Sequence, residues 1–386
     1  MKTLVRDLEP RLVRAAKGFG AIVLTGPRRA GKTFCLRHAF PSASYQLLED
    51  PETIARVRSD PRAWLDELKL PVIIDEVQHA PELLQWIRAR IDRAPAKNGQ
   101  WFITGSQDFA LMKGVTESMA GRAAIFQMLP LSAHELDRWD LLRGGYPEVW
   151  QRPKLAADWF RSYVQSYLER DVRDVTHVKD LGVFRRFLSL AAMRSGHLLN
   201  KSELAQPLGV SVPTIGQWVD VLQTTGVVQL VHPYFENFEK RLLKTPKLYF
   251  NDAGLLCHLL GFDSLKALEK TTLIGQVFET FVASELVKQQ LSNGLERAIY
   301  YFRDEQGLEV DFVVPRDSGQ VELIEAKWTK TPTPPMAKPI GVLLEKLKGR
   351  GFGTVICRGA RDRPERATLA PDVKAVSVEA AFQNVG

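Results

Sequence analysis

The stretch that most constrains this chain is a glycine-bearing loop of eight residues between an apolar run and a helix-like segment. The loop follows Ala21–Leu24, precedes Phe34–Phe40, and reads Gly26-Pro27-Arg28-Arg29-Ala30-Gly31-Lys32-Thr33. A strand, a glycine loop and a helix in this order turn backbone N–H groups inward around a polyphosphate. Lys32 can then reach the β- and γ-phosphates, and the Thr33 hydroxyl can sit on Mg²⁺. The loop therefore predicts a nucleoside triphosphate site that all eight residues line.

A strand that ends in two carboxylates supports the same site. Val72–Ile74 is a continuous apolar run, and Asp75 and Glu76 follow it directly. Polar residues at the carboxyl end of a buried parallel strand face the ligand edge of the sheet. Asp75 can hold Mg²⁺ through water while Glu76 polarises the attacking water as the catalytic base. The same pair could instead cap the helix that we expect at Pro81–Ile91.

Two further candidates adjoin the next strands. The strand Gln100–Thr104 leads into Ser106, which we expect to sense the γ-phosphate or orient water. A turn with a helix cap is the alternative for Ser106. Arg122 stands just before the strand Ala123–Leu129, where its guanidinium could reach a neighbouring subunit's nucleotide and offset phosphoryl charge. A plain surface arginine is the alternative there.

Length and composition bound what else the chain can hold. Its 386 residues correspond to two or three domains of about 100–200 residues each. With 45% apolar and 25% charged residues, the chain has the composition of a folded protein. A net charge of +7 is compatible with an anionic partner such as nucleic acid, without requiring one.

The sequence shows no export or membrane signal. Met1–Gly18 lacks a continuous apolar core, and no apolar run reaches the roughly 18 residues of a membrane span. Cys35, Cys257 and Cys357 lie far apart without metal-type spacing, which favours a reducing compartment. We therefore expect a cytoplasmic protein without a membrane partner.

The order of these motifs carries a resemblance to a known family. The phosphate loop, Val-Ile-Ile-Asp-Glu, Thr-Gly-Ser, Ala-Gly-Arg and Leu-Pro-Leu-Ser resemble the AAA+ class ATPases of bacteria and archaea of the AAA_14 type, with a C-terminal DUF4143 region. The resemblance covers nearly the whole chain. It implies a five-stranded parallel sheet, ATP and Mg²⁺ as cofactors, and assembly into homo-oligomers such as rings or hexamers.

The same resemblance implies a role for each candidate residue. Lys32 and Thr33 would lie on phosphate and magnesium, with Asp75 as the metal-side acid, Glu76 as the base, Ser106 near the sensor position and Arg122 as a finger acting in trans. The sensor position, usually Asn in the wider class, holds Ser106 or Thr104 here. This departure predicts slow or regulated hydrolysis.

A glycine-proline turn follows the first domain. Gly144-Gly145-Tyr146-Pro147-Glu148 is similar to the Gly-Gly-x-Pro element of signal-transducing relatives, which implies that Pro147 contacts the nucleotide from a lid. By residue chemistry alone, the stretch is a turn followed by a helix. Next, Lys154–Leu190 has aromatic residues at the helical spacing that favours a core. Arg170 or Arg173 in that helical region could serve as a second finger.

The next region has the pattern of a winged helix. Helices at Lys201–Leu208 and Val212–Thr225 flank a turn, and strands at Val227–Val231 and Lys247–Phe250 follow. We expect its DNA contacts, mainly to phosphate, from Thr214, Gln217, Lys240, Arg241 and Lys244. Winged helices also serve as protein-interaction or subunit-packing modules, and acidic residues dilute this wing.

The C-terminal region carries a candidate metal site. Asp311 lies on a predicted strand, and Glu325 and Lys327 lie two apart, hence on the same face, of the next strand. Asp311 and Glu325 can share a divalent ion, while Lys327 can position the attacking hydroxide and a charged phosphate. This arrangement resembles the restriction-endonuclease-like PD-(D/E)XK fold, with Glu279 at the position of the helix carboxylate. Solvent-facing strands produce the Glu-x-Lys pattern by chance, and related ATPases keep such a scaffold to grip nucleic acid.

We therefore predict an α/β chain of three parts. They are a P-loop AAA+ ATPase domain at 1–142, a helical lid with a winged helix at 143–262, and a restriction-endonuclease-like α/β domain at 263–386. The first functional hypothesis is an ATPase that binds or remodels structured DNA such as junctions or forks, by translocation or branch migration, with Mg²⁺-dependent cleavage left open. The second is a nucleotide-gated regulatory or defence switch that binds a protein partner through a catalytically silent nuclease-like domain.

Overall fold

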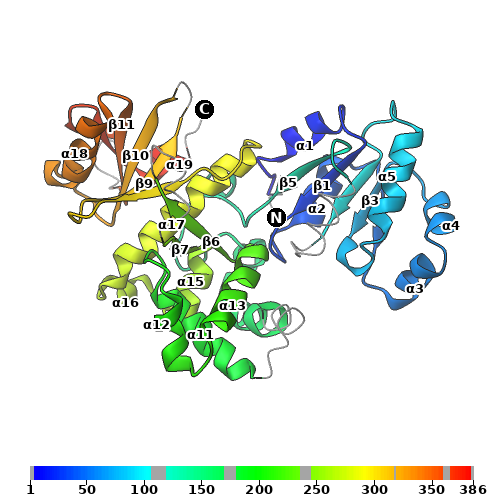
Figure 1. Cartoon of the computed structure of the whole chain (residues 1–386), viewed down its shortest axis with the longest axis horizontal. Coiled ribbons are helices and arrows are strands. Elements are labelled where there is room, and N and C mark those ends of the chain that lie inside the picture. Colours follow the sequence, from blue (N-terminus) through cyan, green and yellow to red (C-terminus); the bar gives the residue numbers. More distant parts are fainter. Residues whose placement is uncertain are drawn as a thin grey trace. The chain divides into compact units, whose positions relative to one another are not determined.

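The chain forms two compact units, each with its own sheet (Figure 1). The first comprises Met1–Pro130, Thr224–Gly226 and Leu291–Glu296. The second comprises Leu131–Gln223, Val227–Gln290 and Arg297–Gly386. Within them, the computed structural model describes residues 4–105, 119–168, 180–234, 245–316, 319–359 and 366–383. In these described residues, no helix combines the length and apolarity needed to cross a bilayer.

The first unit is built on a parallel sheet in the order β2-β3-β4-β1-β5. This confirms the five-stranded parallel sheet predicted from the sequence. Every residue of β1, β3 and β4 is buried, as expected for central strands that are covered on both faces. The strands are β1 (Ala21–Thr25), β2 (Ser44–Leu47), β3 (Val72–Asp75), β4 (Trp101–Thr104) and β5 (Ala123–Gln127).

Two helices cover one face of this sheet. They are α1 (Glu9–Ala15) and α2 (Lys32–Ala39). The apolar cluster on this face joins side chains of both helices to alternate residues of the strands: Leu8, Leu12, Ile22, Leu24, Ala30, Cys35, Leu36, Ile73, Phe102 and Met128. Alternate strand residues point to opposite faces, so the intervening residues form a second core.

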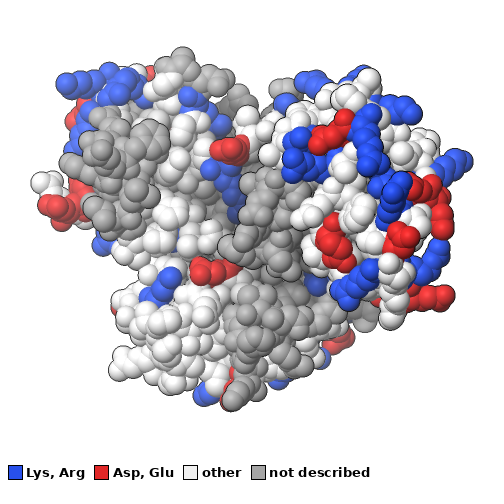
Figure 2. All heavy atoms as spheres, turned by 45° about the vertical axis from the view of Figure 1, so that its right-hand side comes forward, with Lys and Arg blue, Asp and Glu red and all other residues white. Residues whose placement is uncertain are grey.

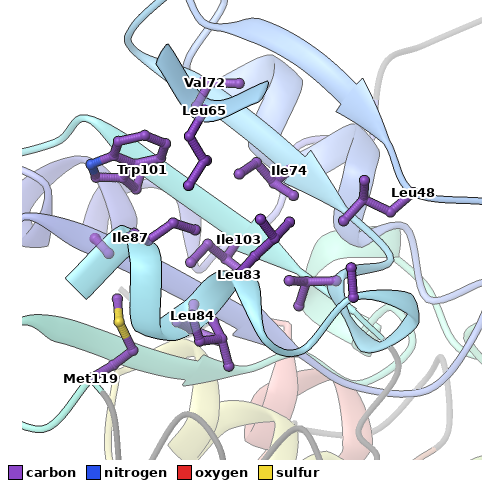
Figure 3. Close-up of a cluster of buried hydrophobic side chains, with 14 of the residues drawn as sticks. Leu48, Leu65, Val72, Ile74, Leu83, Leu84, Ile87, Trp101, Ile103 and Met119 are labelled. Atoms are coloured by element: carbon purple, nitrogen blue, oxygen red, sulfur yellow. The ribbon is translucent and has the colours of Figure 1, made fainter. Parts of the chain in front are cut away.

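Three helices cover the opposite face. They are α3 (Pro51–Ser59), α4 (Pro61–Asp66) and α5 (Leu83–Arg93), and the short turn η1 (Val77–His79) precedes α5. Figure 3 shows how side chains of α5 gather on those of the strands: Leu83, Leu84, Ile87, Ile74 and Ile103. Because the strands are parallel, their carboxyl ends meet at one edge, where Thr25, Asp75 and Thr104 lie.

The second unit is built on a mixed sheet in the order β12-β13-β11-β10-β9-β8-β6-β7. The pairs β10-β11, β11-β13 and β6-β8 are parallel. The pairs β9-β10, β12-β13, β6-β7 and β8-β9 are antiparallel. The strands are β6 (Val228–Pro233), β7 (Lys247–Phe250), β8 (Tyr300–Arg303), β9 (Glu309–Pro315), β10 (Val321–Lys327), β11 (Gly351–Cys357), β12 (Arg366–Ala370) and β13 (Val373–Ser377).

The helices of this unit precede, connect and follow those strands. The described ones are α7 (Ala133–Leu136), α8 (Pro147–Gln151), α9 (Ala156–Tyr163), α11 (Leu181–Met193), α12 (Lys201–Ala205), α13 (Val212–Thr224), α15 (Ala253–Leu259), α16 (Leu265–Glu269), α17 (Leu273–Ser292), α18 (Lys338–Leu347) and α19 (Val378–Phe382). The short turns are η2 (Pro153–Leu155), η3 (Val164–Leu168), η4 (Gln206–Leu208) and η6 (Pro334–Ala337). The helix α18 connects β10 to β11 and packs its Ile340, Leu343 and Leu347 into their core.

One sheet spans the two C-terminal regions that the sequence analysis separates. The hairpin β6-β7, which follows α11, α12 and α13, joins β8 through the parallel pairs His232↔Tyr300 and Pro233↔Tyr301. The division into 1–142, 143–262 and 263–386 stays a prediction. In the structure, however, the sheet runs across position 262.

The largest local difference from the predicted elements is at the N-terminus. The sequence predicts a helix from Thr3 to Gly18, whereas α1 spans only Glu9–Ala15. A proline at the start of α1 favours a helix beginning there. The residues before α1 are bonded to other parts of the unit instead, through the backbone N–H and side chain of Arg6.

Candidate functional site

The phosphate loop leaves β1 at the carboxyl edge of the first sheet. Gly26 has φ 144° and Gly31 has φ 93°, a region that L side chains rarely adopt. A Cβ on Gly26 would lie 2.0 Å from the Met128 carbonyl oxygen, so only glycine fits at that turn. Gly31 then begins α2, and among the described residues no side chain caps that helix. The loop thus presents the helix N-terminus, which favours an anion.

Lys32 sits within the loop that it completes. Its Nζ atom donates hydrogen bonds to the carbonyl oxygens of Gly26 and Pro27, both at 2.9 Å, and the residue is 6% exposed. A buried ammonium next to a helix N-terminus and glycine amides is a suitable donor set for a polyphosphate. The loop residues Gly26–Thr33 therefore fit the nucleotide predicted from the sequence.

Asp75 is held at the end of β3 by three donors. Its Oδ2 atom accepts hydrogen bonds from Thr33 Oγ1 at 2.6 Å and from the Tyr45 hydroxyl at 2.9 Å. Its Oδ1 atom accepts one from the backbone N–H of Glu76 at 3.0 Å. Burial raises the pKa of Asp75, and the bonds from Thr33 and Tyr45 oppose that rise. A hydroxyl and a carboxylate oxygen in contact are a donor set that suits Mg²⁺.

Tyr45 is a site residue that the sequence analysis did not name. It lies on β2 and is the register partner of Ile73, two residues before Asp75 and on the same face of the sheet. Its hydroxyl therefore reaches Asp75. A polar residue on the strand beside β3 is only a weak signal of a site residue. In the sequence, Tyr45 cannot be distinguished from an aromatic residue of the core.

Glu76 directly follows β3 with its backbone in the left-handed region, at φ 57°. Its Oε2 atom lies in contact with Gln78 Nε2 and 4.0 Å from Arg28 Nη1 of the phosphate loop. Carboxylate and ring atoms of Glu76, Glu49 and His79 lie within 4.8 Å of one another. Glu76 is thus half-buried beside the phosphate loop, within a polar group.

The structure describes one of the two sensor candidates, Thr104, and not the other. Ser106 lies outside the described residues, so its role stays a prediction. Thr104 ends β4 and is fully buried, and among the described residues its Oγ1 atom has no hydrogen-bond partner. Because β4 lies between β3 and β1, this hydroxyl sits between the acid pair and the phosphate loop.

Arg122 lies at the opposite edge of the sheet. It precedes β5, which is parallel to β1, so it stands beside Ala21 rather than beside the loop after Thr25. The five residues of β1 span about 17 Å. Its guanidinium donates to both carboxylate oxygens of Asp92, at 2.6 and 3.2 Å. Arg122 therefore does not serve the nucleotide of its own chain, and a role in trans stays a prediction.

The second unit brings together the acids and the lysine predicted in its C-terminal region. Asp311 on β9 accepts the backbone N–H of Ala326 at 2.9 Å, which fixes it beside β10. Lys327 Nζ lies 3.5 Å from Asp311 Oδ2 and in contact with Glu325 Oε2. Glu325 is only 2% exposed, and among the described residues its Oε1 atom has no hydrogen-bond partner.

Glu279 of α17 approaches the same cluster, held by two residues of β7. Tyr249 donates its hydroxyl to Glu279 Oε1 at 2.5 Å, and Lys247 Nζ lies 3.5 Å from the same oxygen. Lys247 also pairs with Glu309 of β9 at 2.5 Å and is 4% exposed. Because the sequence predicts a winged helix that includes β7, Lys247 and Tyr249 were not expected as neighbours of this cluster.

The cluster is rich in buried negative charge. Burial, followed by the nearby Asp311 carboxylate, raises the pKa of Glu325 to about 8 and that of Glu279 to about 7. Burial alone would lower the pKa of Lys327, but Asp311 and Glu325 raise it overall. Two acids with raised pKa values and an unpaired carboxylate oxygen are chemically suited to a divalent cation.

The predicted DNA contacts are only partly described. Gln217 lies exposed on α13, whereas Thr214 is half-buried and its hydroxyl bonds to that of Ser211 at 2.8 Å. Lys240, Arg241 and Lys244 lie outside the described residues, as do Arg170 and Arg173. In Figure 2, basic and acidic side chains are interspersed over the right-hand part of the drawn face.

Pro147 begins α8 after a turn that is packed within the second unit. The Gly145 N–H donates to Asp252 Oδ2 at 2.7 Å, and a Cβ on Gly144 would lie 2.2 Å from Asp252 Oδ1. Asp252 also caps α15 through the N–H of Leu255 at 2.8 Å. The turn and helix expected from residue chemistry are present, and the nucleotide contact of Pro147 stays a prediction.

The fold and the first site together define a class. A glycine loop after the first strand of a parallel sheet, with an acid pair at the carboxyl end of β3 and β4 between them, is the arrangement of a P-loop ATPase of the AAA type. Family models match three successive parts of the chain: an AAA domain at residues 19–137, a domain of unknown function (DUF8612) at 136–266, and a domain of unknown function (DUF4143) at 274–375. The AAA and DUF4143 resemblances are thereby confirmed.

The family follows from curated relatives. The chain is 34% identical over 339 residues to uncharacterized protein Rv2008c of Mycobacterium tuberculosis and to uncharacterized protein Mb2031c of Mycobacterium bovis, covering 85% of this chain and 75% of each relative. It therefore belongs to the same family as these mycobacterial proteins. Uncharacterized protein MJ1544 of Methanocaldococcus jannaschii is 22% identical over 358 residues, covering 81% of this chain and 75% of that protein.

Solved structures resemble the chain only distantly. The Walker-type ATPase PABY2304 of Pyrococcus abyssi aligns with a TM-score of 0.44 at 15% identity, covering 66% of this chain and 94% of that one. A signal transduction ATPase with a tetratricopeptide repeat sensor from Pyrococcus horikoshii aligns with a TM-score of 0.22 at 12% identity, covering 73% and 48%. Likenesses this slight add nothing to the family assignment.

Proposed function

We propose that this protein binds and hydrolyses ATP in its first unit and acts on DNA through a divalent-cation site in its second. The observation that carries the DNA part is the cluster of buried Glu325 with the half-buried Asp311 and Lys327. Glu325 keeps one carboxylate oxygen without a hydrogen-bond partner among the described residues. Leaving a buried carboxylate oxygen unpaired is costly unless a ligand takes it.

In the first unit, each residue has a distinct task. Lys32 and the amides at the start of α2 would bind the phosphates, while Thr33 and Asp75 would hold Mg²⁺, which neutralises charge on the phosphates when bound. Glu76 would accept a proton from the attacking water. Arg28, 4.0 Å from Glu76, lies close enough to influence its orientation before nucleotide binds.

In the second unit, the proposal is that Asp311 and Glu325 hold a divalent ion, with Glu279 as a further ligand. The ion would supply Lewis acidity at a phosphate and lower the pKa of a bound water. Lys327 would orient the nucleophile and bind the phosphate. The order α17-β8-β9-β10-α18-β11, with β9 antiparallel and β11 parallel to β10, supports a restriction-endonuclease-like fold. The order α11-α12-α13-β6-β7 likewise supports a winged helix.

The DNA part is tested with the full chain and labelled duplex, single-stranded, forked and four-way junction DNA. Cleavage that needs Mg²⁺ or Mn²⁺ and disappears in Asp311→Ala supports the site. Glu345→Gln, which changes an exposed acid of α18, is the matched control and should cleave normally. Cleavage that survives in Asp311→Ala would remove this cluster from the reaction.

Coupling between the units is tested by the ATPase rate. If the protein remodels DNA, one of these DNAs should raise the rate, and binding should weaken steeply with salt. A rate that no DNA changes, together with a salt-insensitive protein complex, would instead favour the nucleotide-gated switch.

Assembly is proposed to be homo-oligomeric, as a ring or hexamer, with Arg122 serving a neighbouring nucleotide. Arg122→Ala protein mixed with Glu76→Gln protein should then regain some ATPase activity, because a mixed interface pairs an intact Glu76 with an intact Arg122. Absence of rescue at every mixing ratio would count against a finger in trans.

A further inference from the structure

A buried arginine outside the phosphate loop contacts the loop directly. Arg6 lies in the segment before α1 and is 5% exposed. Its Nη1 atom donates to the Ala30 carbonyl oxygen at 2.8 Å, and its Nη2 atom donates to the Leu129 carbonyl oxygen at 2.7 Å. The planar guanidinium makes the two bonds from two nitrogens held at a fixed spacing, which the single nitrogen of an ammonium does not reproduce. Arg6 therefore ties the phosphate loop to the segment that follows β5.

The segment that carries Arg6 is itself fixed. The Arg6 backbone N–H donates to Glu9 Oε1 at 3.1 Å, and Glu9 Oε2 lies 2.7 Å from His38 Nδ1 near the end of α2. Glu9 is 7% exposed. Arg6 thus contacts Ala30 just before α2, and Glu9 contacts His38 near the end of α2.

We propose that Arg6 is a positioning residue for the nucleotide site. Ala30 and Gly31 share one planar trans peptide unit, in which the C=O and N–H groups point in opposite directions. By holding the Ala30 carbonyl, Arg6 directs the Gly31 N–H to the other side of the loop. The loop binds phosphate through inward-pointing amides, so a rotated peptide would present a carbonyl where a donor is needed. This inference rests on the proposed nucleotide site.

Leu129, whose carbonyl oxygen Arg6 also holds, lies two residues before the second unit begins. Met128, next to Leu129, donates its N–H to Thr25 at 2.8 Å and faces Gly26 of the loop. Two residues beyond Leu129, Leu131 accepts a hydrogen bond from Lys288 of α17 at 3.0 Å. Arg6 therefore holds a segment that is also bonded to the end of β1 through Met128.

The test measures the affinity of the full chain for a fluorescent ATP analogue with Mg²⁺. Arg6→Met should raise the Kd about tenfold or more, because loop misplacement weakens every phosphate contact. The Kd of Arg6→Lys should lie between those of the wild type and Arg6→Met. Arg90→Met is the matched control, since Arg90 joins Arg62 and Asp66 of the same unit away from the loop. It should lower the melting temperature without changing the Kd.

A second measurement separates positioning from loss of folding. In Arg6→Ala protein, guanidinium ion at millimolar concentration should restore analogue binding, whereas equal sodium chloride should not. Equal affinities of Arg6→Met and wild type would overturn the inference, as would a loss in Arg6→Met no larger than that in Arg90→Met. Absence of binding by the wild type would instead overturn the proposed nucleotide site, so the two failures are distinguishable.

Discussion

The phosphate-loop site and the acidic cluster each contain a lysine and acidic residues. The partners that these charged groups have differ between the two sites. In the first unit, Lys32 is bonded to two carbonyl oxygens, and Asp75 receives three hydrogen bonds from neutral donors. In the second, Lys327 lies between Asp311 and Glu325, and one Glu325 oxygen lacks a partner among the described residues. In the first site, Lys32 and Asp75 therefore each have hydrogen-bond partners without a ligand.

This contrast teaches where a ligand should matter for stability. A site built from neutral donors keeps its shape when empty, and the ligand adds affinity rather than fold. A cluster in which partly buried carboxylates outnumber the ammonium groups beside them is held at a cost, and a bound cation relieves that cost. Removing ligands should therefore affect the two units unequally.

The largest effect is expected from the phosphate-loop lysine. Lys32→Ala should weaken binding of an Mg²⁺–ATP analogue by about 100-fold or more, because charge-assisted bonds to the phosphates are lost. Fluorescence titration measures this. Lys346→Ala, which removes an exposed lysine of α18, should bind as the wild type does. Unchanged binding by Lys32→Ala would mean that the nucleotide does not bind at the phosphate loop.

Turnover should depend on Glu76 almost as strongly. Glu76→Gln should keep ATP binding and lower the ATPase rate by about 100-fold, the scale of a general base. Phosphate release under saturating ATP measures it. Retained turnover would remove Glu76 as the base and point to another group near the loop.

Divalent cations should stabilise the second unit when no nucleotide is present. At a cation concentration of about 100 times Kd, binding adds about 2.7 kcal/mol, or roughly 5–10 °C in melting temperature for a unit of this size. Calorimetry with Mn²⁺ and with chelator measures the shift. Asp311→Ala should lose it and Glu345→Gln should keep it. Equal shifts in both variants would place the cation elsewhere.

The metal-free second unit should lose stability as pH rises. The pKa of Glu325 is raised in the folded protein from 4.5 to about 8, so the folded state binds the extra proton. The stability that this group contributes is then present below pH 4.5 and is lost as pH rises toward about 8. Glu325→Gln does not titrate, so its free energy of unfolding should fall less than that of the wild type over this pH interval. If the free energies of unfolding of the two proteins fell equally with pH, the buried Glu325 carboxyl would not be the cause of the loss.

The smallest effect is expected at Tyr45. Tyr45→Phe removes one of three donors to Asp75 and should raise the Mg²⁺ concentration for half-maximal ATPase activity about fivefold, since a hydrogen bond contributes about 1 kcal/mol. Binding of nucleotide in chelator should not change. Tyr301→Phe, which loses a bond to a carbonyl in the second unit, is the control.

The candidate nucleotide site was the part most open to prediction from sequence. Its residues come from short motifs with fixed chemistry, and parallel strands bring their carboxyl ends to one edge without further information. The loop Gly26–Thr33 and the pair Asp75–Glu76 meet there as predicted. Tyr45 and Arg6 were missed because their contacts depend on strand register and on a non-helical segment, neither of which leaves a periodic pattern.

The acidic cluster was predictable in part. Spacing within β10 put Glu325 and Lys327 on one face, and Asp311 on the adjacent strand completed the group. Lys247 and Tyr249 were not foreseen, because nothing local in the sequence indicates that the hairpin β6-β7 continues the sheet through β8. Such long-range pairing is set by tertiary packing rather than by propensity.

The continuous sheet sets a limit on how this protein can be divided. A fragment that begins at residue 263 would lack Lys247, the buried cation that lies against Glu279 and Glu309. Those carboxylates would then lose the ammonium that contacts both of them, and β8 would expose an open edge where β6 had been. The DUF4143 region is therefore expected to express and fold well only in a fragment that includes the hairpin β6-β7. Recombination between relatives should accordingly exchange the hairpin and the DUF4143 region together.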